Sequence, residues 1–321
     1  MIPPFVDTEW IREHLDGIVI ADARWYVDGS SGRDAYAAGH IPGAVFVDLD
    51  TALTSHVDAA VGGRHPLAEP VDFAAAMGAL GIGDDDTVVA YDDAGGVIAA
   101  RLVWMLRVTG HEAALLDGGL AAWDGKLEAG VRTSPRYVVE SANAVDGGRS
   151  IDVGPEAGGT GSGQPTGGAR QLDVGISSRA ATTFTARPWP AERLATIDEA
   201  AAPAAAGAPV IDARPADRFA GAPDDLDPRA GHIPGAVSVP CRESLDPAGK
   251  LLPLADLRAR FAVEDAAAVI SYCGSGVTAC HNLLAMEQAG LGDGGRLFPG
   301  SWSQWSRDPA RPVQIGVDRG R

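Results

Sequence analysis

A cysteine in a glycine-rich loop is the residue of this sequence best placed for covalent chemistry. The loop reads Tyr272-Cys273-Gly274-Ser275-Gly276-Val277-Thr278-Ala279-Cys280. A strand-like apolar run, residues 267–272, precedes it, and a helix-like run, residues 277–289, follows. A strand, a short loop and a helix in this order direct successive backbone N–H groups at one point. These groups would stabilise a thiolate at Cys273 or an anion attached to its sulfur.

The alternative is a buried cysteine that only packs at a strand end, because a free thiol behaves as a small hydrophobic group. Gly274 and Gly276 flank Ser275 and favour close approach of a ligand to the backbone instead. Cys280 lies further along the helix-like run and is predicted to belong to the core, and Cys241 has no evident role. Without a Cys-x-x-Cys pair, neither a disulfide framework nor a metal site is expected.

The length and charge of the chain restrict its class. Its 321 residues suggest two domains. A formal net charge of −17 argues against nucleic acid as a partner, because a phosphate backbone attracts basic surfaces. No apolar run approaches the roughly 20 residues that a membrane span needs, so no membrane association is expected. The first residues lack the basic start and long apolar run of a signal peptide, so a cytoplasmic protein is expected.

The chain carries one series of short motifs twice, in the same order, which indicates a duplicated domain. The matched segments are Ile20–Arg24 with Val210–Arg214, Ala38–Val45 with Ala230–Val237, Thr87–Tyr91 with the run before Cys273, and Gly119–Trp123 with Gly300–Trp305. In each half, predicted strands alternate with predicted helices such as residues 73–80 and 254–261. This alternation predicts an α/β fold in which a parallel sheet is flanked by helices on both faces. Ligands of such sheets bind beyond the carboxyl ends of the strands, where Cys273 is predicted to lie.

We predict an N-terminal domain over residues 1–135, a linker over 136–189 that is rich in glycine at 146–178, and a C-terminal domain over 190–321. Asp92 occupies in the first half the position of Cys273 in the second. A carboxylate cannot replace a thiolate nucleophile, so the first half is predicted to be catalytically silent and to form one wall of the cleft. His40 and His232 lie in identical turns, one in each half, and are predicted to be structural.

The tandem repeat, the two Gly-His-Ile-Pro-Gly-Ala turns and the Cys273 loop together resemble the two-domain rhodanese family. The resemblance covers nearly the whole chain apart from the linker. Within the family, Cys-Gly-Ser-Gly-Val-Thr-Ala is similar to the loop of 3-mercaptopyruvate sulfurtransferases. Thiosulfate sulfurtransferases typically carry basic residues at the positions of Gly274 and Ser275. The resemblance implies two tandem rhodanese-like domains and sulfur transfer through a persulfide on Cys273.

The resemblance also assigns substrate-binding residues. Asp217-Arg218-Phe219 matches the segment with the family's substrate arginine, and a guanidinium can bind a planar carboxylate through two parallel hydrogen bonds. Arg229 is the expected counterpart of a second family arginine, although the segment before it, residues 220–228, is shortened. The alternative for Arg218 is a surface ion pair. The loop itself carries no cation for the thiosulfate dianion, which favours mercaptopyruvate as the donor.

A Ser-His-Asp relay is a further implication of the resemblance. Ser275 matches the loop serine, His65 in Gly63-Arg64-His65-Pro66-Leu67 matches the histidine, and Asp50 matches the acidic member. A hydroxyl oriented by an imidazole can pass a proton to or from a substrate. Asp48 is a rival for the acidic role, and a loop histidine without function is the alternative for His65.

The predicted reaction is attack of the Cys273 thiolate on the sulfur of 3-mercaptopyruvate, with release of pyruvate. Thioredoxin, a small thiol or cyanide would then accept the sulfur. The backbone N–H groups at Gly274, Gly276, Val277 and Thr278 are expected to hold the persulfide anion. No cofactor is required.

Three alternatives to this reaction remain. A thiosulfate sulfurtransferase differs only in the donor, and a non-enzymatic sulfur carrier would accept sulfur without turnover of small donors. A phosphatase of the Cys-x5-Arg type is disfavoured, because its arginine would fall at Ala279.

Overall fold

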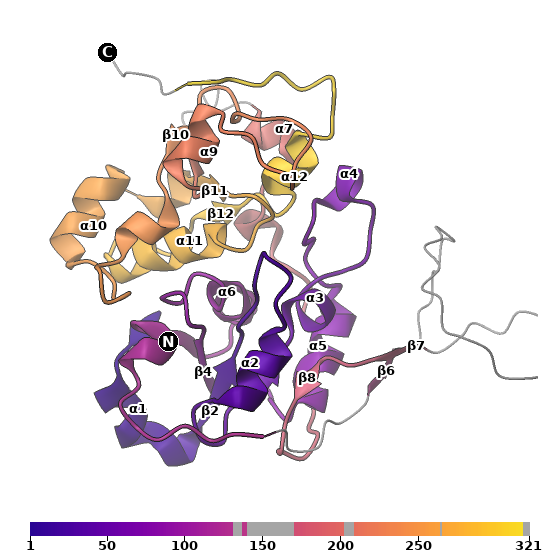
Figure 1. The fold of residues 1–321 in the computed structure, drawn as a ribbon, viewed down its shortest axis with the longest axis vertical. Helices are drawn as coiled ribbons and strands as arrows, with labels where there is room; N and C mark the ends of the chain where they lie inside the picture. The colour runs from indigo at the N-terminus through magenta and orange to yellow at the C-terminus, as the bar shows by residue number, and fades with distance from the viewer. Residues whose placement is uncertain (131–136, 140–169, 202–208, 264, 317–321) are drawn as a thin grey trace, which may run out of the picture.

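The computed structural model describes residues 1–130, 137–139, 170–201, 209–263 and 265–316. Two α/β units lie one above the other in Figure 1, with the N-terminal half below and the C-terminal half above. Most of the predicted linker, including residues 140–169, lies outside the described residues.

The N-terminal half contains a six-stranded sheet in the order β1-β5-β4-β2-β3-β8. Its strands are β1 (Phe5–Val6), β2 (Ile18–Asp22), β3 (Val45–Val47), β4 (Thr87–Tyr91), β5 (Ala113–Leu116) and β8 (Gly175–Ile176). Its helices are α1 (Thr8–His14), α2 (Gly32–Ala38), α3 (Leu49–Ala52), α4 (Ala59–Gly62), α5 (Pro70–Ala79) and α6 (Ala100–Val108). All neighbouring strands are parallel except β8, which runs antiparallel to β3.

The C-terminal half contains a four-stranded parallel sheet in the order β10-β9-β11-β12. Its strands are β9 (Val210–Asp212), β10 (Val237–Ser238), β11 (Ile270–Tyr272) and β12 (Arg296–Leu297). Its helices are α7 (Ile197–Ala200), α9 (Ala216–Ala220), α10 (Leu254–Phe261), α11 (Ala279–Gln288) and α12 (Ser301–Trp305). Between the halves, β6 (Tyr137–Val139) and β7 (Arg170–Leu172) form a separate antiparallel pair.

Helices cover both faces of each sheet, as the sequence pattern predicts. Along β4, Val88 and Ala90 pack in the cluster that includes α5 and α6, whereas Val89 and Tyr91 pack in the cluster that includes α1 and α2. Alternate strand residues point to opposite faces, so a strand apolar throughout requires cover on both sides. Strand β11 is shorter than predicted because residues 266–268 form a 3-10 turn, capped by the Asp265 side chain.

The two halves repeat the same arginine contacts, as expected from the duplicated motifs. After β2, Arg24 forms an ion pair with Asp22 at 2.7 Å and donates to the Gly39 carbonyl at 2.8 Å. After β9, Arg214 does the same with Asp212 and with the Gly231 carbonyl, both at 2.7 Å.

The histidines of the repeated turns are equally matched. His40 stacks on Tyr36 with ring centroids 3.8 Å apart, and His232 stacks on Phe219 at 3.6 Å. Each ring lies buried beside the sheet of its own half, as the structural role assigned to these histidines requires.

Part of the predicted linker packs against the N-terminal half. Strand β8 pairs with β3, Phe184 is buried against Phe73, and Ser177 donates to the Leu80 carbonyl at 2.7 Å. The composition of residues 136–189 did not reveal these contacts, because they involve a few apolar residues in a segment otherwise poor in them.

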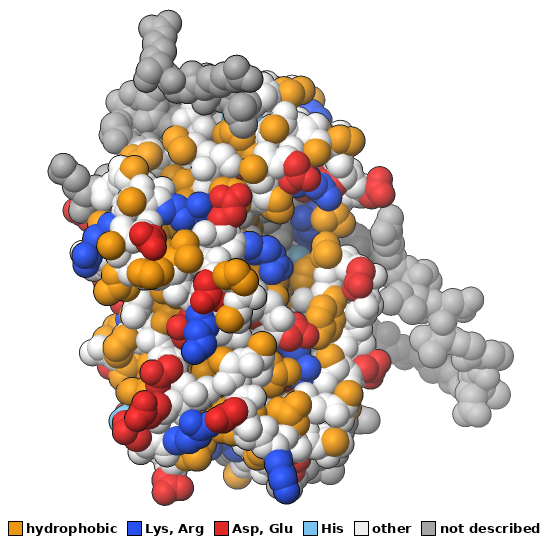
Figure 2. Space-filling view, turned by 60° about the vertical axis from the view of Figure 1, so that its left-hand side comes forward, with side chains coloured by type: hydrophobic (Ala, Val, Ile, Leu, Met, Phe, Trp, Pro, Cys, Tyr) orange, Lys and Arg blue, Asp and Glu red, His pale blue; other side chains and the backbone are white. Residues whose placement is uncertain are grey.

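The two halves share one continuous core. Helix α6 packs against α11, and α4 packs against α12. Arg107 on α6 forms an ion pair with Glu287 on α11. Figure 2 shows one face of the molecule, on which acidic and basic side chains are interspersed and a hollow marks the junction of the halves. No helix within the described ranges is long and apolar enough to cross a membrane.

Candidate active site

Cys273 follows β11 directly and begins the loop that leads to α11. Its side chain is 2% exposed, and its Sγ accepts the N–H of Gly276 at 3.1 Å. Helix α12 holds the backbone, since Ser301 Oγ accepts the Cys273 N–H at 3.1 Å and Trp302 N–H donates to the Cys273 carbonyl at 3.0 Å. A Cβ at Gly276 would lie 2.5 Å from the Pro299 carbonyl oxygen, so only glycine permits this approach.

The matching loop of the first half binds a carboxylate in its N–H groups. Asp92 directly follows β4 and is fully buried. Its Oδ1 accepts from the N–H groups of Ala94 and Gly96, and its Oδ2 from those of Ile98 and Ala99, at 2.7–2.9 Å. The fold therefore presents at this position a set of donors suited to an anion. In the first half, the side chain of the loop itself occupies them.

We expect Asp92→Ala to destabilise the protein by about 3–5 kcal/mol, because it leaves four N–H groups, three of them in buried hydrogen bonds, without their acceptor. Asp93→Ala is the matched control, since Asp93 is exposed and accepts only from Tyr26 within the described chain. Urea unfolding followed by circular dichroism gives both free energies of unfolding. Equal losses in the two variants would show that the buried carboxylate has no special role.

Three side chains, two of them from the N-terminal half, form a relay that reaches the Cys273 loop. His65 Nδ1 lies 2.7 Å from Ser275 Oγ, and His65 Nε2 lies 3.4 Å from Asp50 Oδ1. The indole N–H of Trp25 donates to Asp50 Oδ2 at 3.0 Å. Asp48 instead caps α3, accepting the N–H groups of Asp50 and Thr51. Of the two rival carboxylates, Asp50 is therefore the one beside His65.

Burial sets the protonation state of the relay. It lowers the pKa of His65, and the nearby Arg64 and Arg101 charges act in the same direction, against the raising effect of Asp50. The hydrogen bond from His65 holds the pKa of Asp50 below its ordinary value. At neutral pH the imidazole is accordingly uncharged. A proton on Nε2 then faces Asp50, and Nδ1 accepts the hydroxyl of Ser275.

This arrangement predicts a contribution of His65 to the acid limb of activity. As pH falls through its pKa, which lies below 6.5, Nδ1 gains a proton and stops accepting from Ser275. We expect His65→Gln to reduce the slope of log kcat/KM against pH on the acid side by one proton. Profiles of equal slope in the two proteins would rule out His65 as a titrating member of the relay.

A buried arginine joins the relay to the catalytic loop. Arg101 on α6 is fully buried, and its Nη1 donates to the Gly276 carbonyl at 2.8 Å and its Nη2 to the His65 carbonyl at 3.0 Å. Burial lowers the pKa of Arg101, and its interactions with Cys280 and Cys273 act in the opposite direction. No carboxylate in the described structure hydrogen-bonds to it. The guanidinium of Arg101 therefore links the main chain at His65 to the main chain of the Cys273 loop.

Sequence reasoning missed Arg101, although a signal was present. An arginine stood within an otherwise apolar helical run, residues 97–106, where a charge requires a specific partner.

The two predicted substrate arginines differ in their surroundings. Arg218 on α9 is about one-third exposed and forms an ion pair with Asp224. Arg229 donates to four main-chain carbonyls, those of Trp305, Ser306, Asp308 and Arg311. The guanidinium of Arg229 is therefore bonded to main-chain carbonyls at the end of α12 and in the segment that follows it.

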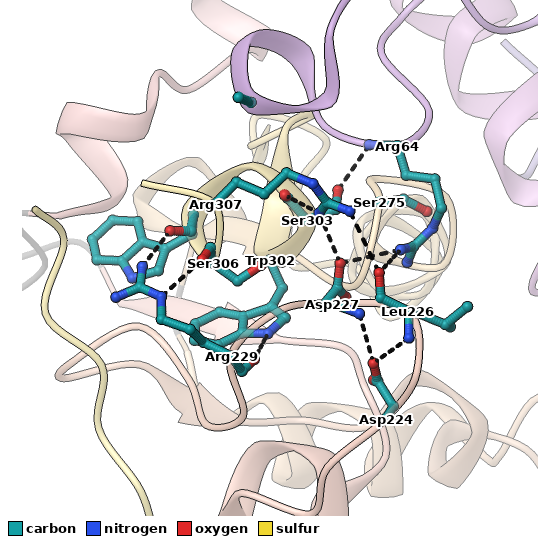
Figure 3. A network of polar contacts seen from close by, with 12 residues as sticks. Arg64, Asp224, Leu226, Asp227, Arg229, Ser275, Trp302, Ser303, Ser306 and Arg307 are labelled. Carbon is teal, nitrogen blue, oxygen red and sulfur yellow. Dashed lines mark hydrogen bonds and ion pairs between the residues drawn. The ribbon is translucent and has the colours of Figure 1, made fainter. Parts of the chain in front are cut away.

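A different arginine lies beside that loop. Arg64 Nη2 is 3.3 Å from the position that a Cβ on Gly274 would take. Figure 3 shows this side chain near Ser275, bonded to Asp227 and to the Leu226 carbonyl. The expectation that no cation lies beside the sulfur considered only residues of the loop itself. The neighbouring cation comes from the other half of the chain.

The remaining thiols are poor nucleophiles. Burial raises the pKa of both Cys241 and Cys280 to about 12. Cys280 donates its S–H to the Gly276 carbonyl at 3.4 Å, as expected of a core residue. Within the described ranges, no group of three His, Cys, Asp or Glu side chains is arranged to hold a metal ion.

The comparisons with known proteins agree with this site. The rhodanese-like domain family matches residues 7–126 and 196–308. A protein of Pseudomonas aeruginosa named as a 3-mercaptopyruvate sulfurtransferase is 37% identical over 309 residues, 93% of each chain. SseB of Mycobacterium tuberculosis, named as a thiosulfate sulfurtransferase, is 34% identical over 94% of this chain and 92% of its own.

Comparison with a solved structure supports the same fold. The crystal structure of SseA from Escherichia coli, described as a 3-mercaptopyruvate sulfotransferase with the rhodanese fold, superposes with a TM-score of 0.65 at 30% identity. The match covers 94% of this chain and 99% of that one. The chain therefore belongs to the rhodanese family, as a member with two rhodanese domains in tandem. It is a sulfurtransferase, and the fold and family predicted from its motifs are confirmed.

Proposed function

We propose that the protein transfers sulfur from 3-mercaptopyruvate to a thiol acceptor through a persulfide on Cys273. The thiolate attacks the donor sulfur, an S–S bond forms, and the C–S bond breaks with its electron pair on carbon. The products are a Cys273 persulfide, which keeps the hydrogen of the donor thiol, and the enolate of pyruvate. A proton then converts the enolate to pyruvate, and the persulfide loses its hydrogen as a proton, so that it is an anion at neutral pH.

The loop supplies the donors for that anion. By analogy with the carboxylate of Asp92, the terminal sulfur would accept from N–H groups at the start of α11, around Thr278 and Ala279. The N–H of Gly276 is already within hydrogen-bond distance of the Cys273 sulfur. The first half, with its donors occupied by Asp92, would contribute the relay and the cleft wall but no nucleophile.

The relay Ser275–His65–Asp50 is the observation that favours mercaptopyruvate. An enolate must be protonated on leaving, and a hydroxyl hydrogen-bonded to a neutral imidazole can deliver that proton. Sulfite, the leaving group from thiosulfate, departs as a stable anion and needs no such delivery. A relay that crosses from one half of the chain to the other therefore suits a carbon leaving group.

Thiosulfate is the second candidate donor, and a specific observation favours it. Arg64 places a guanidinium beside Gly274, where a compact dianion attached to the sulfur would lie. A relative carrying that activity in its name is nearly as similar as the one named for mercaptopyruvate.

Steady-state rates with the two donors, side by side, test the proposal. We expect kcat/KM to be higher with mercaptopyruvate, and Ser275→Ala to lower that value about 100-fold, within the range of general acid–base catalysis. The same variant should change the thiosulfate rate by less than about threefold. A wild-type preference for thiosulfate, or an equal loss with both donors, would overturn mercaptopyruvate as the donor.

We infer the sulfur acceptor and the cellular compartment from the chemistry of the persulfide, not from an acceptor-binding site. The persulfide sulfur extends one atom beyond the buried Sγ, so a small thiol or the exposed thiol of a thioredoxin-like protein is the proposed acceptor. A protein that relies on reduced thiols is suited to the cytoplasm.

A further inference from the structure

A cavity of about 180 Å³ opens beside the Cys273 loop, and we call it the side cavity. It lies beyond the carboxyl ends of three strands, since Ala213 follows β9, Pro240 follows β10 and Thr278 belongs to the loop after β11. Parallel sheets bind ligands at this edge. The rest of its wall includes Cys241, Arg242 and Glu243. The volume far exceeds the roughly 10–15 Å³ that one water molecule needs, so a small organic molecule has room.

Thr278 places the side cavity next to the sulfur that is transferred. The N–H groups proposed for the persulfide anion lie around Thr278 and Ala279, at the start of α11, and Thr278 also borders the cavity. Cys241, in the cavity wall, is buried within interaction range of the Thr278 side chain and of Cys273. A molecule in the side cavity would therefore lie beside the outer sulfur of a Cys273 persulfide.

Two opposite charges stand at the mouth of the side cavity. Arg242 and Glu243 are both exposed. Arg242 donates to the Ala94 carbonyl of the N-terminal half at 3.4 Å, and it forms no ion pair with any residue that the structure describes. Glu243 pairs with Arg260 through Oε2 at 3.0 Å, and its Oε1 has no partner among the described residues. The mouth thus offers a guanidinium to a carboxylate and a carboxylate oxygen to a cation.

We propose that the side cavity binds the sulfur acceptor, and that this acceptor is a small thiol carrying both a carboxylate and an ammonium group. Arg242 would bind the carboxylate and Glu243 the ammonium group, while the thiol lies beside Thr278. The proposal rests on the Cys273 persulfide proposed above and narrows the acceptor from thiols in general to one chemical class.

The transfer step uses only the persulfide anion and the acceptor thiol. The acceptor sulfur forms a bond with the outer sulfur of the persulfide. The bond from that outer sulfur to Cys273 Sγ breaks, and its electron pair stays on Sγ. The proton of the acceptor thiol passes to Sγ. The products are the persulfide anion of the acceptor and the free thiol of Cys273.

Discharge of the persulfide to four thiols tests the charge pattern. L-cysteine carries both charged groups, cysteamine only the ammonium group, 3-mercaptopropionate only the carboxylate, and 2-mercaptoethanol neither. Sodium polysulfide installs the persulfide, so the result does not depend on the donor that the enzyme prefers. At equal thiolate concentrations, we expect the rate to saturate with L-cysteine and to rise linearly with 2-mercaptoethanol, because only L-cysteine occupies a site.

Two variants separate the two charges. Arg242→Met should slow discharge to L-cysteine and 3-mercaptopropionate about 5- to 10-fold, and discharge to cysteamine by less than about twofold. Glu243→Gln should slow discharge to L-cysteine and cysteamine about threefold, and discharge to 3-mercaptopropionate by less than about twofold. Its effect is smaller because Glu243 is exposed and shared with Arg260. The control is Arg12→Met, an exposed arginine whose partner Asp124 is also exposed, which should match the wild type with all four thiols.

Filling the side cavity gives a test that does not depend on charge. Cys241→Phe should slow discharge to L-cysteine at least about tenfold, whereas cyanide, a far smaller acceptor, should lose less than about threefold. If this variant does not fold, Cys241→Leu provides the same comparison. Equal rates with all four thiols, or charge variants that act alike on all of them, would overturn the proposal. A wild-type chain that neither donor can load would instead contradict the proposed function, and discharge of the polysulfide-loaded chain would still decide the role of the side cavity.

Discussion

Cys273→Ser is expected to abolish sulfur transfer while the protein stays folded. A serine hydroxyl is not a nucleophile of comparable strength towards sulfur, and no other thiol can replace the one that is lost, because burial raises the pKa of Cys241 and Cys280 to about 12. The serine oxygen can still accept the N–H of Gly276 that now meets the sulfur. We therefore expect activity below detection, at least about a thousandfold down, and a free energy of unfolding within about 1 kcal/mol of the wild type.

Intact-protein mass spectrometry after donor treatment gives the direct readout. The wild-type chain should gain one sulfur atom, located by peptide mapping on the peptide that contains Cys273, and the variant should gain none. Label on Cys241 or Cys280 in either protein would contradict the assignment of the nucleophile.

Arg101→Met is expected to lower activity strongly while stability changes little. The variant removes a buried charge without a carboxylate partner, which relieves a desolvation cost, but it also frees the carbonyls of Gly276 and His65. These effects on stability oppose each other. The loss of the Arg101 contact has no such compensation at the Cys273 loop, because the residue whose carbonyl it binds, Gly276, also donates its N–H to the Cys273 sulfur. We expect sulfur transfer to fall about 100-fold.

Alkylation of Cys273 by iodoacetamide separates these effects. In Arg101→Met, the rate of alkylation at neutral pH should fall, because the loop that presents Cys273 loses a support, and the free energy of unfolding in urea should change by less than about 2 kcal/mol. Arg101→Lys keeps a charge but cannot span both carbonyls, so it should restore part of the alkylation rate and less of the transfer rate. Equal alkylation rates in Arg101→Met and the wild type would exclude a role of Arg101 in presenting Cys273.

The repeated motifs were sufficient to predict the fold, because each half carries its own alternation of strands and helices. The repeated segment Thr87–Tyr91 forms strand β4, and helix α10 has the predicted bounds. The strand–loop–helix pattern also placed Cys273 at the carboxyl end of a parallel strand. These features depend on local periodicity, turn residues and glycine positions, which a sequence displays directly.

Contacts between the halves could not be predicted in this way. Arg64 and Arg101 reach the catalytic loop only because α4 packs on α12 and α6 packs on α11. The contacts of Arg229 are another example: the motif match gives its position in the sequence, but not the main-chain carbonyls at and after the end of α12 that accept from its guanidinium. Such outcomes depend on the packing of elements far apart in the chain, for which a single sequence carries no local signal.

The carboxylate of Asp92 also indicates how a duplicated domain can lack a nucleophile and still be needed for the structure of the protein. In the N-terminal half, the N–H groups that could bind an anionic ligand bind the carboxylate of Asp92 instead. These hydrogen bonds therefore contribute to the stability of the fold and not to ligand binding. The spacing of the donors differs too: the Gly96 N–H that meets Asp92 comes four residues after it, whereas the Gly276 N–H that meets the sulfur comes three residues after Cys273. A single reverse substitution would therefore meet a loop of the wrong length. The difference between the two halves thus lies in the length of the loop as well as in the residue at its start.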